Sequence, residues 1–102
     1  MSSVETTLQR IANHPGVIGY FVLNSEGVVI KHHGFDQTQV SSYAHLVHQF
    51  SIQARTGVRD IDPTNQLSFL RIRSKDDNEI IICPENDLTL VVVQTLSKES
   101  SE

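Results

Sequence analysis

Two segments in the middle of the chain have the clearest pattern of apolar and polar residues. Residues 37–55 carry apolar side chains at helical spacing, and the preceding Asp36-x-x-Gln39 pair is typical of a helix start. Residues 67–73 alternate, which predicts a strand with Ser68, Leu70 and Ile72 on one face. The DPTN sequence at residues 62–65 is a strong turn signal between them. We therefore expect a long helix, a turn and a strand.

The other predicted elements fit around this unit. A short helix is expected to begin at the Ser2-x-x-Glu5 capping pair and to end before the NHPG sequence at residues 13–16. Strands are predicted at residues 17–23, 28–32, 79–83 and 88–94. The expected fold class is α+β, a five-stranded antiparallel sheet with a helix on each face in the order α-β-β-α-β-β-β. We expect one domain over residues 1–96 and a disordered polar tail over residues 97–102.

The apolar face of the long helix is wider than a sheet alone requires. One interpretation is a core helix with one stray apolar residue, Ile52. The interpretation that we favour is a helix that meets two surfaces, its own sheet and another chain. The side chains expected on the sheet are Tyr43, Leu46, Phe50 and Ala54. Those expected on the other chain are Ala44, His48, Ser51, Ile52 and Arg55.

The strand at residues 67–73 is expected at an edge of the sheet, because arginines occur in its alternation. An apolar edge strand promotes aggregation unless it is charged or paired. The arginines alone could prevent this; alternatively, two copies pair antiparallel about a two-fold axis and form a continuous ten-stranded sheet. The residues of this strand expected at the dimer interface are Ser68, Phe69, Leu70, Arg71, Ile72 and Arg73.

Composition and charge exclude several classes of function. The net charge of −4 over 102 residues leaves no dominant basic surface for a nucleic acid. The lone Cys83 excludes an internal disulfide. The apolar runs are far shorter than the roughly 20 residues of a membrane helix, and the N-terminus does not resemble a secretory signal. We expect a soluble intracellular domain without membrane insertion.

No catalytic, cofactor-binding or metal site is predicted. His45 and His48 have the helical spacing of a ligand pair, but a structural zinc site needs four ligands. Asp60 and Asp62 are explained by turn hydrogen bonds and by neighbouring arginines. The sequence has neither an activated-nucleophile pattern nor a glycine-rich nucleotide-binding pattern. A local basic cluster consists of Arg55, Arg59, Arg71, Arg73 and Lys75. An acidic peptide segment is a better target for this cluster than a nucleic acid, because the whole protein is acidic.

The string VRDIDP-x-N-x-L-x-FLRIRSK at residues 58–75 resembles the roadblock-type dynein light chains. The preceding helix, with Tyr43-Ala44 and Ala54-Arg55, is similar to theirs, as are the ETTL sequence at residues 5–8 and the NSEG sequence at residues 24–27. The resemblance covers roughly residues 4–95. It points to the dynein branch and not only to the wider roadblock superfamily.

This resemblance implies a non-catalytic homodimer that is formed by the edge strand and the long helix. It implies binding to the dynein intermediate chain, with a role in tail assembly and cargo attachment in microtubule-based transport. The implied location is the cytoplasm and cytoskeleton, with cytoplasmic and axonemal dynein both open. A heterodimer with a paralogous light chain also stays open. The alternative function, taken from the wider superfamily, is a regulator or scaffold for a small GTPase.

Overall fold

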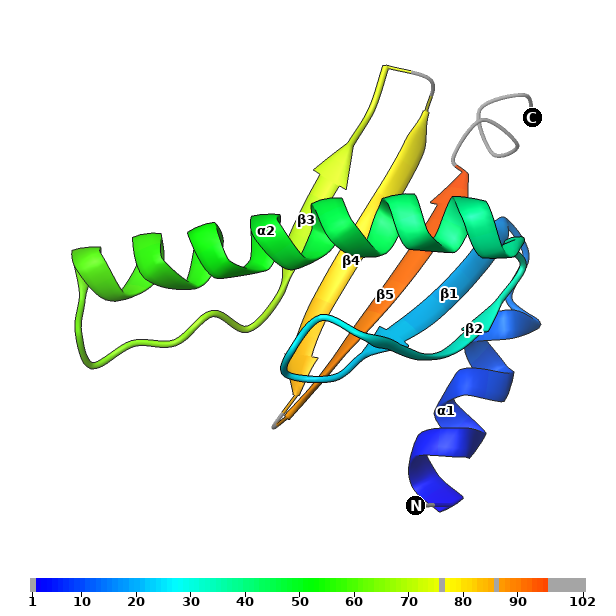
Figure 1. Cartoon of the computed structure of the whole chain (residues 1–102), viewed down its shortest axis with the longest axis horizontal. Helices are drawn as coiled ribbons and strands as arrows, with labels where there is room; N and C mark the ends of the chain where they lie inside the picture. Colours follow the sequence, from blue (N-terminus) through cyan, green and yellow to red (C-terminus); the bar gives the residue numbers. More distant parts are fainter. Residues whose placement is uncertain (1, 76, 86, 96–102) are drawn as a thin grey trace.

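The protein forms a five-stranded antiparallel sheet with a helix on each face (Figure 1). A computed structural model describes residues 2–75, 77–85 and 87–95. The strand order is β2-β1-β5-β4-β3. The elements are α1 (Ser2–Ala12), β1 (Val17–Leu23), β2 (Val29–His33), α2 (Gln37–Ile61), β3 (Leu70–Arg73), β4 (Asn78–Glu85) and β5 (Leu88–Thr95). The expected α+β fold is confirmed; the tail at residues 97–102 and the Ser2 and Glu5 side chains lie outside the described part.

Alternation along β1 separates the two layers of the core. Phe21 and Leu23 point toward α2, whereas Tyr20 and Val22 pack with Leu8 of α1 on the opposite face. Each face of β1 thus buries apolar surface, which is why its sequence is a nearly uninterrupted apolar run.

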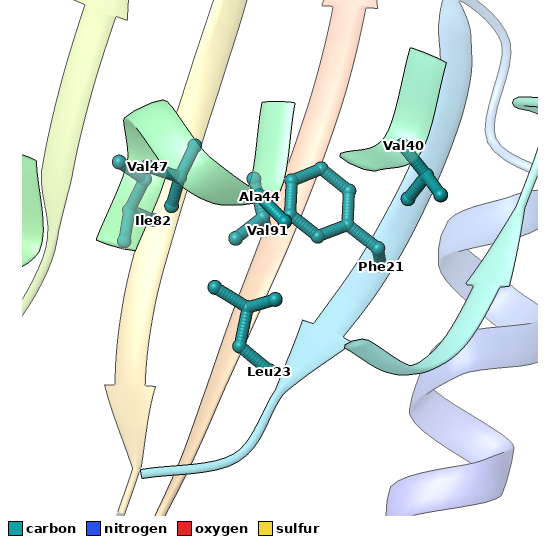
Figure 2. Packing of buried hydrophobic residues seen from close by; sticks show 7 residues of the cluster. All are labelled: Phe21, Leu23, Val40, Ala44, Val47, Ile82 and Val91. Atoms are coloured by element: carbon teal, nitrogen blue, oxygen red, sulfur yellow. The ribbon is translucent and has the colours of Figure 1, made fainter. Parts of the chain in front are cut away.

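The larger core lies between α2 and the sheet (Figure 2). The side chains of α2 that are buried here are Val40, Ala44 and Val47, which recur at helical spacing. They meet Phe21, Leu23, Ile82 and Val91 of three strands. The start of α2 is fixed as expected: the Gln39 N–H donates to Asp36 Oδ1 at 2.8 Å, and the Asp36 N–H donates to Gln39 Oε1 at 3.1 Å.

The second helix is longer than the sequence predicts. It continues through Gly57 to Ile61 instead of ending near Arg55. Asp62 ends it: Oδ1 of Asp62 accepts hydrogen bonds from the Thr64 N–H and hydroxyl, and these bonds lower the pKa of the Asp62 carboxyl. One glycine costs a helix only about 1 kcal/mol, so it does not break a segment that continues to a strong turn.

Gly57→Ala is therefore expected to stabilise the protein by about 0.5–1 kcal/mol. Gly57 lies inside α2, and a Cβ there would meet no atom within 4 Å. Gly27→Ala is the matched control, because Gly27 has φ +85° and a Cβ would lie 2.8 Å from the His48 ring. Urea denaturation at fixed protein concentration should move the midpoint up for Gly57→Ala and down for Gly27→Ala. An equal loss of stability in both would contradict the helix bounds.

The third strand is shorter than the sequence predicts, since β3 begins at Leu70 and not at residue 67. Leu70 pairs with Ile82 of β4, so the same register would place Ser68 opposite Pro84. Proline has no N–H to donate, and the pairing stops before it reaches this position. The other strands differ from their predicted bounds by no more than two residues.

Candidate dimer and partner interface

β3 is one of the two edges of the sheet, as the sequence predicts. The N–H of Ser74 donates to the carbonyl oxygen of Asn78 at 2.8 Å, which makes this a hydrogen-bonded pair. Hydrogen-bonded and non-hydrogen-bonded pairs alternate along an antiparallel ladder. The register therefore directs the backbone N–H and C=O groups of Ile72 and Leu70 toward β4. Those of Arg73 and Arg71 point away from it. The free edge of β3 is thus formed by the N–H and C=O groups of Arg71 and Arg73.

The inner face of α2 differs from the expected one. Leu46 and Phe50 were expected on the sheet, but 50% and 41% of their surfaces are exposed, so this assignment is wrong. Ala44 and Ser51 are buried instead, and their small side chains let α2 approach its own sheet closely. Their contact with a second chain stays a prediction. The structure of one copy does not favour it, because Ala44 and Ser51 expose little surface.

The exposed apolar residues of α2 lie on two flanks of this buried line. We call the side with Leu46, Phe50 and Ile61 the apolar flank, and Ile61 is almost fully exposed. The other side carries Ile52, which is also exposed, and His48, whose ring stands over Gly27 in the turn between β1 and β2. The helix is therefore apolar beyond what its own sheet covers, as the sequence predicts, but most of the excess lies on the apolar flank.

The far end of α2 faces the segment that leads back to β3 (Figure 1). Side chains of the two line a groove of about 510 Å³. Arg55 and Arg59, one helical turn apart, contribute to its wall together with Asp60. The groove is completed by Thr56, Gln66, Leu67 and Pro84. Arg55, predicted at the dimer interface, lies in this groove, and its contact with a second chain stays a prediction.

Arg71 and Arg73 lie on the opposite face of the sheet, above a buried carboxylate. Glu79 is 3% exposed, and its Oε2 lies 2.9 Å from Arg71 Nε and 3.8 Å from an Nη atom of Arg73. The Arg71 contact is an ion pair without hydrogen-bond geometry. The other oxygen, Oε1, accepts a hydrogen bond from Gln94 Nε2 at 2.9 Å. The basic cluster of the sequence is therefore divided between two faces.

Glu79 is not among the residues that the sequence pattern predicts at the site. The sequence signal for Glu79 was its position at the start of an apolar strand whose neighbour carries two arginines. Only the register of β3 with β4 places Glu79 opposite Arg73. The remaining interface residues, Ser68, Phe69, Leu70 and Ile72, lie along β3 or directly before it. Ser68 and Phe69 are exposed, whereas Leu70 and Ile72 pack against the core under α2.

The described residues offer little for catalysis. Burial, and then the nearby Glu85, raise the pKa of the half-buried Cys83 thiol, which disfavours the thiolate that a nucleophile needs. No group of three metal-ligating side chains occurs within residues 2–75, 77–85 and 87–95. No helix in this part of the chain is long and apolar enough to span a membrane. The notable features are thus surfaces: an open strand edge, an apolar flank and two pairs of arginines.

Comparison with known proteins identifies the fold. The Roadblock/LC7 domain matches residues 3–95. A Roadblock/LC7 domain from Streptomyces avermitilis has 15% identity and a TM-score of 0.75, over 83% of this chain and 71% of that one. MglB from Myxococcus xanthus has 15% identity and a TM-score of 0.74 over 95% and 79% of the two chains. MglC from the same organism has 16% identity and a TM-score of 0.56 over 92% and 81%. The chain belongs to the Roadblock/LC7 family.

Proposed function

We propose that the protein is a non-catalytic adaptor that works as a homodimer. The observation that carries this proposal is the open edge of β3, where Arg71 and Arg73 present unpaired backbone groups in the described chain. An antiparallel copy of the same edge satisfies them and joins two sheets into one of ten strands. The apolar flank of α2, with Leu46 and Phe50, supplies exposed apolar surface for the second copy.

The first candidate partner is the dynein intermediate chain. The resemblance to roadblock-type dynein light chains is strongest over residues 58–75. These include the end of α2, the segment between α2 and β3, and β3 itself. This segment includes β3, whose free edge carries the proposed dimer interface. In this candidate function the dimer supports assembly of the dynein tail and cargo attachment, in the cytoplasm and on microtubules.

The second candidate is regulation or scaffolding of a small GTPase. The three solved structures named above come from bacteria, and this favours the second candidate. Their identities of 15–16% support the shared fold more than a shared partner. The comparisons therefore lean toward the GTPase candidate, whereas the string at residues 58–75 supports the dynein candidate.

Direct binding distinguishes the two candidates. The purified protein is immobilised and presented with the N-terminal region of a dynein intermediate chain, and separately with small GTPases loaded with GDP or with a non-hydrolysable GTP analogue. A dynein light chain is expected to bind the intermediate chain at the same affinity whichever nucleotide is present. A GTPase that binds at least about tenfold more tightly in one nucleotide state, without binding of the intermediate chain, would establish the second candidate instead.

A further inference from the structure

The face of the sheet opposite α2 carries a group of accessible side chains beside the β3 edge. Arg71 and Arg73 lie on this face, 56% and 64% exposed. Between them and β5, Ile81 is half-buried on the same face, since it pairs with Arg71 and with Val92. We call these three side chains the arginine strip. α1 packs over β1 and β5 through Leu8 and leaves the strip open.

The buried Glu79 carboxylate determines the charge that the arginine strip presents. Its carboxylate is nearly inaccessible, while the two guanidinium groups above it are exposed, so the face presents two cations for one buried anion. Arg71 approaches the carboxylate through Nε. Its two Nη groups form the fork that recognises carboxylates. A guanidinium that is already held in place loses less side-chain freedom when it binds.

We propose that the arginine strip docks an acidic, amphipathic segment of a partner protein, with partner carboxylates on Arg71 and Arg73 and partner apolar side chains on Ile81. Charge complementarity supports this occupant, because the strip is a local excess of positive charge on a chain with a net charge of −4. A nucleic acid, which needs a broad basic surface, is disfavoured by the same acidic background.

This inference rests on the proposed function and deepens it by specifying the chemistry of the partner segment. Where two copies pair along β3, four arginines gather on one face of the joined sheet, and one segment from each side can reach them. The like charges at such a junction repel each other unless they are offset. The two buried Glu79 carboxylates offset part of this repulsion, and bound acidic residues offset the rest.

The test uses a defined probe, a fluorescein-labelled amphipathic helix of 18 residues built from Leu, Glu and Gln; a second peptide has Lys in place of each Glu. Anisotropy titrations of the full chain measure both affinities at low and at high salt. We expect the acidic peptide to bind and to weaken with salt, and the basic peptide to bind at least about tenfold more weakly.

Variants locate the binding surface. Arg73→Gln should weaken binding of the acidic peptide roughly fivefold to tenfold, because it removes charge-assisted hydrogen bonds and leaves the Arg71–Glu79 contact in place. Arg71→Gln tests the second cation, and circular dichroism checks that it folds. The matched control is Arg55→Gln with Arg59→Gln, which removes two charges from the groove on the other face. It should change the affinity less than about twofold.

Three results would overturn the proposal: equal binding of the two peptides, an unchanged affinity in Arg73→Gln, or a larger loss in the groove control. Light scattering on a sizing column reports the oligomeric state of each variant separately. A dimer that ignores the acidic peptide would therefore reject the arginine strip alone, whereas a monomer would reject the proposed dimer.

Discussion

Arg71→Pro is expected to weaken dimerisation by about 3 kcal/mol, roughly 100-fold in the dissociation constant. The Arg71 N–H points away from β4, so in the proposed dimer it donates to the other copy. Proline removes this donor and is tolerated at a sheet edge. It also removes the ion pair with Glu79, a loss that the Arg71→Ala control shares. The two-fold axis doubles the loss, since each copy contributes the same residue. Sedimentation equilibrium over a range of protein concentrations measures the change.

Arg71→Ala is the matched control for this experiment, because it loses the same guanidinium and keeps the backbone donor. Leu70→Pro tests the opposite side of β3. The Leu70 N–H points toward Ile82 of β4, so proline there should destabilise the single copy as well as the dimer. Equal dissociation constants for Arg71→Pro and Arg71→Ala would mean that the β3 edge is not where copies pair.

Glu79→Ala is expected to lower the free energy of unfolding by about 1–2 kcal/mol. The substitution leaves the Gln94 side-chain amide without its acceptor at 2.9 Å and removes the carboxylate that holds Arg71. Arg73→Ala is the control, since Arg73 is exposed and its Nη atom lies 3.8 Å from the carboxylate, so its loss should cost less than about 1 kcal/mol. Urea denaturation at one fixed protein concentration keeps the contribution of association constant.

A midpoint for Glu79→Ala that matches the wild type would contradict a stabilising role for the buried carboxylate. In that case the arginines would be held by the strand alone, and the strip would lose its preorganisation. Glu79→Gln separates charge from hydrogen bonding, because the glutamine oxygen still accepts from Gln94 while the ion pair is lost. Its stability should lie between those of the wild type and Glu79→Ala.

The sequence predicted the elements that rest on local chemistry. The apolar run of β1 was found at its observed bounds, and the Asp36–Gln39 capping pair was found because its hydrogen bonds involve neighbours in the chain. The end of α2 was missed for a quantitative reason. Gly57 weakens a helix by about 1 kcal/mol, which is less than the tendency of the segment to continue to the Asp62 cap.

Features that depend on tertiary contacts could not be read from the pattern. The large side chains of Leu46 and Phe50 are obvious candidates for the core, yet the small Ala44 and Ser51 face the sheet because they allow a closer approach. The burial of Glu79 depends on the register between β3 and β4 and on Gln94 of β5. A hydrophobic wheel contains neither of these. The edge position of β3 was therefore predicted correctly and part of the inner face of α2 was not, while the interface itself stays a prediction.

Pro84 has a consequence for the lifetime of the proposed dimer. Its missing N–H stops β3 at four residues, so in the proposed dimer two copies would share a short ladder built on the outward groups of Arg71 and Arg73 within β3. Few hydrogen bonds then have to break at once for the copies to separate, and the exchange of subunits is correspondingly faster. A cell that contains two roadblock chains would hold a continuously remixed population of pairs, whose composition follows the relative amounts of the two chains.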